Sequence, residues 1–164
     1  YRVYRYAHVL LWRAECAVEL GDLVTALTYV NMIRARAANE VVMGRCRTFQ
    51  QPSTVYGLSD VDYSLPAANY LVGQYASFPN QAYAREAVHW EFRLEFSMEG
   101  YRFFDLVRWG KAAETLNPYI AKDVQFRTFL TGAVFNAGQD EYQPIPQAQI
   151  DVQGSDILTQ NPGY

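Results

Sequence analysis

Three glutamates at helical spacing, Glu91, Glu95 and Glu99, are the residues of this chain whose type and pattern most resemble catalytic machinery. Residues at i and i+4 share one face of a helix, so neighbouring carboxylates lie close together. Glycoside hydrolases use a pair of carboxylates about 5 to 10 Å apart as general acid and as base or nucleophile. Those carboxylates normally face an open cleft from separate strands or loops, and a run on one helix does not provide such a cleft.

Arginines on two preceding helices indicate that the glutamates form structural ion pairs instead. A helical wheel places Glu95 and Glu99 among the apolar residues of their own helix. The same construction places Arg13 and Arg34 among apolar residues of two preceding helices. A buried charge without a partner costs several kcal/mol, whereas a guanidinium can bind both oxygens of a carboxylate. We therefore expect the two arginines to pair with the two glutamates across a helix interface, with Asp105 as another partner for Arg34.

Two further arginines lie near acids in the sequence. Arg102 follows Glu99 by three residues, and Arg108 follows Asp105 by three, so each pair shares a helix face. Structural ion pairs are our preferred interpretation of all these charges, and we assign no catalytic residue and expect no enzyme. The residues expected in these ion pairs are Arg13, Arg34, Glu95, Glu99, Arg102, Asp105 and Arg108.

The remaining reactive residues form no recognisable site. His8 and His89 stand alone, without a second ligand at i+4 or a CxxC pair, so no metal site is predicted. The chain has no glycine-rich phosphate loop and no nucleophile motif, and we expect no cofactor. Cys16 lies on the apolar face of a predicted helix and is expected to be a buried free thiol, with a Cys16–Cys46 disulfide as the alternative.

The composition is that of a globular domain. Half of the 164 residues are hydrophobic and 15% are aromatic, which argues against disorder. The longest apolar runs are much shorter than the ~20 residues of a membrane span. The formal net charge is −3, without a basic stripe, so we expect no nucleic-acid partner.

Two helices joined by a tight turn are predicted at residues 1–39. Gly21 ends the first helix, and Asp22 caps the second. The turn ELGDLVTAL resembles that of a tetratricopeptide repeat, but no second copy follows at a 34-residue period. One repeat cannot bury its own face, so we expect other repeats elsewhere in a longer parent protein. The apolar stripe of the first helix is Tyr6, Val9, Leu10, Cys16, Ala17 and Leu20.

Two more helices are expected within residues 81–116. The first covers about 82–98 and is capped by Asn80, and the second covers about 102–113. Gly100 permits the turn between them.

The other two parts of the chain have little periodicity. Residues 40–80 contain several prolines, glycines and tyrosines, which predicts a loop-rich insertion. Residues 117–164 are expected to be an irregular tail, because its prolines prevent a long closing helix.

Three parts of the sequence carry a family pattern. They are RLEFSMEGYRFFDLVRWGKA, YAHVLLWRAECAVELGD running into ALTYVNMIRARA, and YQPIPQAQIDV closing in LTQNPGY. They resemble, respectively, the signature, the late repeat helices and the C-terminal tail of the RagB/SusD family of outer-membrane nutrient-binding lipoproteins. Phe92 departs from the family pattern, which usually has an arginine there. Signature residues that match by type are Arg93, Glu95, Glu99, Gly100, Arg102, Phe104, Asp105, Leu106, Arg108 and Trp109.

The resemblance implies a mainly α-helical protein on a tetratricopeptide-like repeat scaffold with long irregular loops, of which residues 1–164 are the C-terminal part. It also implies an outer-membrane lipoprotein at the bacterial cell surface, attached through a lipid on an N-terminal cysteine outside this chain. Members of the family bind oligosaccharide or other nutrient ligands and deliver them to a TonB-dependent outer-membrane transporter.

Aromatic residues of the insertion are the expected sugar contacts, because sugars place their C–H faces on exposed rings beside polar groups. Each tyrosine has the alternative role of packing the loop onto the helices. Two other functions stay open for the protein: a helical-repeat scaffold that contacts only proteins, and a glycan-degrading enzyme. The candidate sugar contacts are Tyr56, Tyr63 and Tyr75, with Asp60, Asp62 and Gln74 as polar neighbours.

Overall fold

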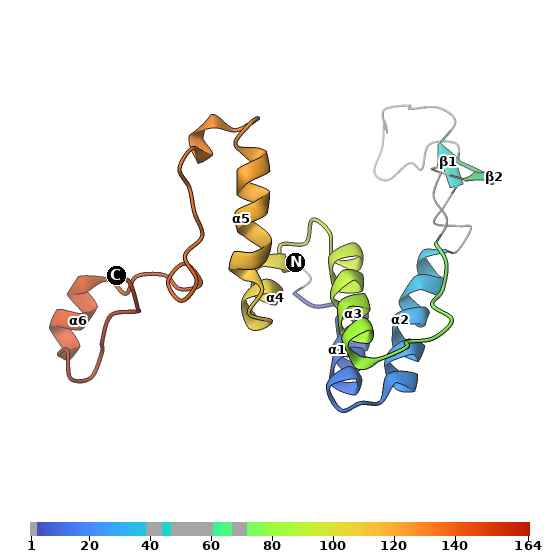
Figure 1. Cartoon of the computed structure of the whole chain (residues 1–164), viewed down its shortest axis with the longest axis horizontal. Helices are drawn as coiled ribbons and strands as arrows, with labels where there is room; N and C mark the ends of the chain where they lie inside the picture. The colour runs from blue at the N-terminus through green and yellow to red at the C-terminus, as the bar shows by residue number, and fades with distance from the viewer. Residues whose placement is uncertain (1–2, 39–43, 47–60, 67–71) are drawn as a thin grey trace, which may run out of the picture. The chain divides into compact units, whose positions relative to one another are not determined.

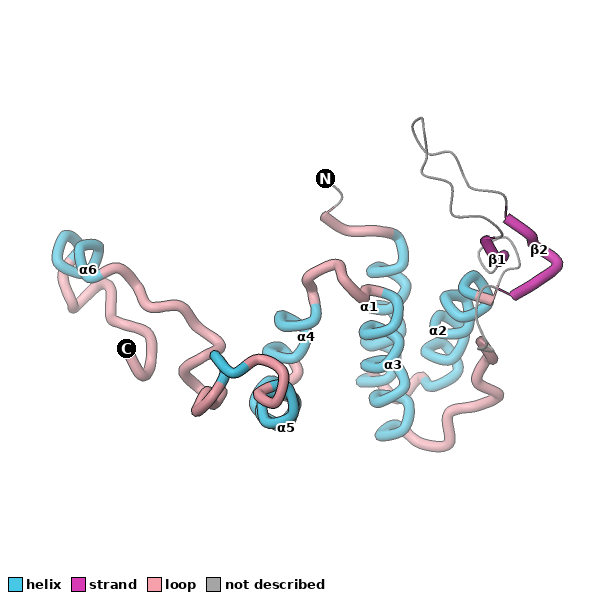
Figure 2. Tube along the Cα trace, turned by 90° about the horizontal axis from the view of Figure 1, so that it is seen from above, coloured by secondary structure: helices cyan, strands magenta, loops and turns pink. Residues whose placement is uncertain are grey.

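The computed structural model describes residues 3–38, 44–46, 61–66 and 72–164. The chain divides into two compact units, Tyr1–Ser97 and Met98–Tyr164. The described part is mainly helical, which confirms the predicted fold class, and helices make up most of its regular structure (Figure 2). None of the described helices is long and apolar enough to cross a lipid bilayer.

The first unit is built from three helices that lie side by side (Figure 1). They are α1 (Tyr6–Glu19), α2 (Leu23–Ala37) and α3 (Gln81–Glu95). Helices α1 and α2 form the predicted hairpin, and α3 packs against both. Alanines on all three helices let the backbones approach closely around a shared core. Its fully buried members include Leu11, Ala14, Val18, Ala26, Val30, Val88 and Phe92.

Helices α2 and α3 begin at the capping residues that the sequence predicted, and α1 ends near the predicted glycine. Gly21 has φ +80°, a left-handed conformation that other residues avoid, and it follows the end of α1. At the start of α2, the Asp22 carboxylate accepts a hydrogen bond from the Thr25 N–H at 3.0 Å. At the start of α3, the Asn80 side chain accepts one from the Tyr83 N–H at 2.8 Å. Both predicted caps are therefore present.

The buried face of α1 differs from the predicted stripe. Only Leu10 and Ala17 of that stripe are buried, and the core is formed instead by the adjacent face with its alanines. Because α1 is apolar on both faces, its periodicity could not determine which face meets α2 and α3. Cys16 is a free, exposed thiol, so the prediction that it is buried is wrong. The exposed members of the stripe are Tyr6, Val9, Cys16 and Leu20.

The described part of the insertion contains two short strands. β1 (Gly44–Cys46) pairs antiparallel with β2 (Val61–Pro66), with Arg45 opposite Asp62. The sequence predicts a loop here, because strands this short leave almost no periodic signal. The irregular segment 72–80 then leads into α3.

The second unit contains α4 (Arg102–Arg108), α5 (Ala112–Asp123), a 3₁₀ turn (Thr128–Leu130) and α6 (Gln147–Gln153). The sequence predicted one helix over 102–113, but Gly110, with φ +65°, separates α4 from α5. Helix α5 then continues through Pro118 into the part that was expected to be irregular. Proline removes one backbone donor, and this helix tolerates the loss.

Side-chain amides hold the irregular parts of the tail. The Asn117 amide donates to the Phe135 carbonyl at 3.1 Å and accepts from the Phe135 N–H at 2.8 Å. Gln160 makes the same pair of bonds to Ile145, at 2.9 and 2.7 Å. Each amide thus satisfies the N–H and the carbonyl of one residue, as a neighbouring strand would in a sheet.

Replacement of Gly100 by alanine tests the turn before α4. Gly100 has φ +86°, and a Cβ atom there meets nothing within 4 Å, so any cost comes from backbone conformation alone. We expect Gly100→Ala to lower the free energy of unfolding by about 1 to 2 kcal/mol in urea denaturation. Gly73→Ala is the matched control, because Gly73 also has open space but no left-handed φ, and it should be neutral or slightly stabilising. Equal stability of the two variants would contradict this account.

Candidate functional site

An ion pair between Arg34 and Glu91 joins α2 to α3 inside the first unit. Nη1 of Arg34 lies 2.9 Å from Oε2 of Glu91, and both side chains are largely buried. Arg34 also donates through Nε to the carbonyl oxygen of Gly73, on the segment that leads into α3. The prediction that Arg34 pairs with Glu95, Glu99 or Asp105 is wrong. The register of the two helices brings Arg34 opposite the acid one turn earlier.

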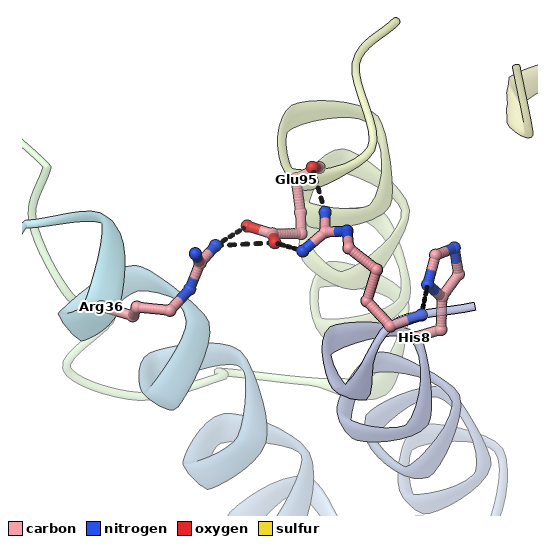
Figure 3. A network of polar contacts seen from close by, with 4 residues as sticks. His8, Arg36 and Glu95 are labelled. Atoms are coloured by element: carbon pink, nitrogen blue, oxygen red, sulfur yellow. Dashed lines mark hydrogen bonds and ion pairs between the residues drawn. The ribbon is translucent and has the colours of Figure 1, made fainter. Parts of the chain in front are cut away.

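Glu95, one turn further along α3, is held by two arginines (Figure 3). Arg5 donates to its Oε1 at 2.7 Å and to its carbonyl oxygen at 2.9 Å. Nη2 of Arg36 lies 2.6 Å from both carboxylate oxygens. The Glu95 side chain is only 6% exposed, whereas that of Arg36 reaches solvent. One carboxylate therefore links α3 to the residue before α1 and to the last turn of α2.

His8 lies beside this network in Figure 3. Its Nδ1 accepts a hydrogen bond from the backbone N–H of Arg5 at 3.1 Å, so Nδ1 carries no proton. Its ring stacks on Phe96 with centroids 3.7 Å apart, and the Arg5 guanidinium lies 5.0 Å from the same Phe96 ring. His8 therefore has a structural place at the start of α1. Among the described residues, no group of three or more His, Cys, Asp or Glu side chains could hold a metal ion.

Arg13 does not join the buried pairs. It is exposed on α1, because the helix buries the face next to the one that the sequence favoured. The prediction that Arg13 points into the core is therefore wrong.

Several charged residues of the signature lie on α4 or just before it. Arg108 donates through Nε to Asp105 Oδ1 at 3.0 Å, and Asp105 is buried. The guanidinium groups of Arg102 and Arg108 lie 5.6 and 4.8 Å from the ring of Trp109. Glu99 is half-buried just before this helix. The signature thus places its charges against one another and against an aromatic ring.

Burial shifts the pKa of Glu91. Desolvation raises the pKa of Glu91 above its ordinary value, and the hydrogen bond and charge of Arg34 only partly oppose this, while the Glu95 charge adds to it. The exposed Glu19 behaves in the opposite way. Hydrogen bonds from Arg85, at 2.6 and 2.8 Å, lower the pKa of Glu19.

Of the three candidate sugar contacts, the structure describes the side chain of Tyr75. Tyr56 lies outside the described residues, and Tyr63 lies in β2 with a side chain that also lies outside them. The Asn31 amide donates to the Tyr75 carbonyl at 2.9 Å and accepts from the Tyr75 N–H at 2.9 Å. The Arg34 guanidinium lies 4.9 Å from the centre of the half-buried Tyr75 ring. Tyr75 is thus held at its backbone and over its ring.

This arrangement favours ion pairs over acid–base chemistry. Glu91 and Glu95 are buried, and arginines engage both carboxylates. A glycosidase acid has to reach the oxygen of the glycosidic bond, and neither carboxylate can do so without losing its partner.

Comparison with known proteins bears directly on the resemblance seen in the sequence. The SusD family model matches residues 1–164, which is the whole chain. The chain belongs to the SusD family. SusD-like protein P38 of Formosa agariphila is 31% identical over 116 residues, or 71% of the chain. The crystal structure of a SusD homolog from Bacteroides thetaiotaomicron VPI-5482 matches 99% of the chain with a TM-score of 0.66 and 25% identity.

The chain spans only a small part of these SusD-family relatives. It covers 18% of the length of protein P38 and 26% of the crystallised homolog. The similarity therefore concerns one region of a larger protein.

Sequence reasoning missed four residues of the network in this SusD-family chain. Glu91 belongs to the same i+4 series as Glu95, so its position on the same helix face indicated that it also lies in the interface. Arg5 precedes the first helix and Arg36 lies off its apolar face, so neither position indicated an inward partner. Asn31 offered a weak signal, because asparagine inside a helix often bonds to backbone elsewhere.

The raised pKa of Glu91 predicts how stability depends on pH. A carboxyl group whose pKa is higher in the folded state favours folding when protonated, and this contribution is lost as the pH rises through the raised value. From about pH 7 down toward the ordinary value of 4.5, we expect the wild type to gain stability relative to Glu91→Gln. Urea denaturation at several pH values measures this difference.

Glu19→Gln is the control with the opposite sign. Because the pKa of Glu19 is lowered by folding, its contribution is present above 4.5 and is lost as the pH falls below that value. Parallel pH profiles for Glu91→Gln and Glu19→Gln would show that burial does not govern Glu91.

Proposed function

We propose that the intact protein binds nutrient oligosaccharides at the bacterial cell surface and delivers them to a TonB-dependent outer-membrane transporter. The observation that carries this proposal is the family match over the whole chain, together with the signature around Glu99 and Trp109. The proposal includes an outer-membrane lipoprotein whose lipid-bearing cysteine lies outside this chain.

The proposed role is binding without catalysis. Glu91 and Glu95 are the carboxylates closest to an acid–base pair, and both are engaged by arginines in the core. A binding protein needs a stable scaffold for its ligand contacts, and this network ties together the three helices of the first unit.

We also propose that residues 1–164 form the C-terminal part of a larger helical domain. Val9 is 51% and Leu20 is 80% exposed on α1, although the opposite face of the helix is already buried. Exposed apolar side chains on a second face of a helix indicate that this face packs against another element. Helices from the remainder of the protein would supply that cover, since the chain spans 26% of the crystallised homolog.

The exposed Cys16 thiol tests this cover. In the intact protein, with Cys46 replaced by serine, we expect Cys16 to react with a thiol reagent at least about ten-fold more slowly than in guanidinium, because neighbouring helices shield it. Labelling followed by mass spectrometry gives the rate. A folded intact protein that labels as fast as the unfolded one would contradict the proposed cover of α1.

The proposed function is tested on the intact protein in its native membrane. We expect a proteinase added to intact cells to digest the protein, because it lies on the outer surface. The protein should also co-purify with a TonB-dependent transporter. It should bind immobilised glycans without releasing reducing sugar. Mutation of the lipid-bearing cysteine should release the protein from the membrane and leave glycan binding intact. Release of reducing sugar by the purified protein that disappears in folded Glu95→Gln would establish an enzyme instead.

A further inference from the structure

The irregular segment 72–80 is held in place by two side chains of α2. The Arg34 guanidinium donates to the Gly73 carbonyl, and the Asn31 amide makes two bonds to the Tyr75 backbone. At the start of α3, Gln81 donates to the Val18 carbonyl at 2.7 Å. A stretch without regular structure thus has a fixed position on a rigid scaffold.

Three aromatic rings gather on this segment and the first turn of α3. Phe78 is buried, and its ring lies 5.4 Å from that of Tyr75 and 6.2 Å from that of Tyr83. The rings of Tyr75 and Tyr83 are 6.2 Å apart and almost perpendicular, at 88°. Tyr83 is 46% exposed, so the cluster is anchored on one side and open to solvent on the other.

The polar groups beneath the cluster position it more than they stabilise the fold. A buried ion pair such as Arg34–Glu91 contributes little net stability, because desolvation of both charges offsets their attraction. The raised pKa of Glu91 agrees with that balance, since burial outweighs the effect of Arg34. The geometric effect is large, because Arg34 fixes the Gly73 carbonyl and covers the Tyr75 ring. Aromatic contacts that are held before a ligand arrives lose less entropy on binding.

We propose that Tyr83 and Tyr75 form a saccharide-binding subsite, in which a sugar ring places its C–H face on the exposed ring of Tyr83 and touches the edge of Tyr75. This inference rests on the proposed function. A tyrosine ring offers an apolar face and a hydroxyl, a combination that suits a sugar ring with its C–H face and hydroxyl groups. Gln74, exposed and next to Tyr75 in the chain, provides an amide for sugar hydroxyls. Tyr83 was missed from sequence because it lies in the first turn of a helix.

The subsite is tested on the intact protein by isothermal titration calorimetry with maltohexaose, xylohexaose, laminarihexaose and alginate hexamers. For the hexamer that binds wild type, we expect Tyr83→Ala to weaken affinity at least about five-fold, as truncation of an aromatic anchor does. Tyr83→Phe keeps the stacking ring and should stay within about two-fold of wild type. Tyr119→Ala, an exposed tyrosine on α5, is the matched control and should bind like wild type. Thermal melts of every variant detect loss of folding.

The outcomes separate this inference from the function on which it rests. Wild type that binds none of the four hexamers counts against oligosaccharide binding and against the subsite with it. Wild-type binding that Tyr83→Ala leaves unchanged overturns the subsite alone. If Tyr83→Ala fails to fold, a folded Tyr83→Leu variant with full affinity overturns it equally, because leucine fills the space without an aromatic face.

Discussion

Two carboxylates buried on one face of α3 impose the constraint on which the first unit depends. Glu91 and Glu95 lie one turn apart, and each must meet a guanidinium because an unpaired buried charge costs several kcal/mol. The partners come from three places in the chain: Arg5 before α1, and Arg34 and Arg36 on α2. Apolar packing alone tolerates small shifts between helices. Hydrogen bonds of 2.6 to 2.9 Å to fixed carboxylates do not tolerate such shifts. The ion pairs therefore define the register of the three helices.

The same constraint extends to backbone outside the helices. Arg34 uses one nitrogen for Glu91 and another for the Gly73 carbonyl, so the acid indirectly positions the return of the chain from the insertion. Arg5 likewise bonds to the Glu95 carbonyl and lies against the ring of Phe96, at the end of α3. The network therefore anchors irregular segments as well as helices.

The sequence predicted the helical class, the hairpin and the caps, because these depend on local chemistry. Asp22 and Asn80 bond to backbone three residues away, and Gly21 satisfies a local φ. The partners of the buried acids depend instead on how two helices slide past each other, and no local pattern fixes that register. The prediction of the buried face of α1 was wrong for a related reason. The helix has apolar residues on both sides, so Val9 and Leu11 fit a helical period equally well. Only contact with α2 and α3 determines that Leu11 is buried and Val9 is exposed.

The glutamates that looked most like a catalytic pair position other residues of the first unit. Replacing a buried pair by apolar residues of similar size is often neutral for stability, so stability alone does not account for charges in this core. Their placement has a more specific consequence. Glu91 orients Arg34, Arg34 fixes Gly73 and covers Tyr75, and Asn31 completes the hold on the Tyr75 backbone. An apolar core would leave the loop carbonyl of Gly73 without this charged donor. The buried charges thus explain why an irregular segment of this chain can present aromatic rings in one fixed arrangement.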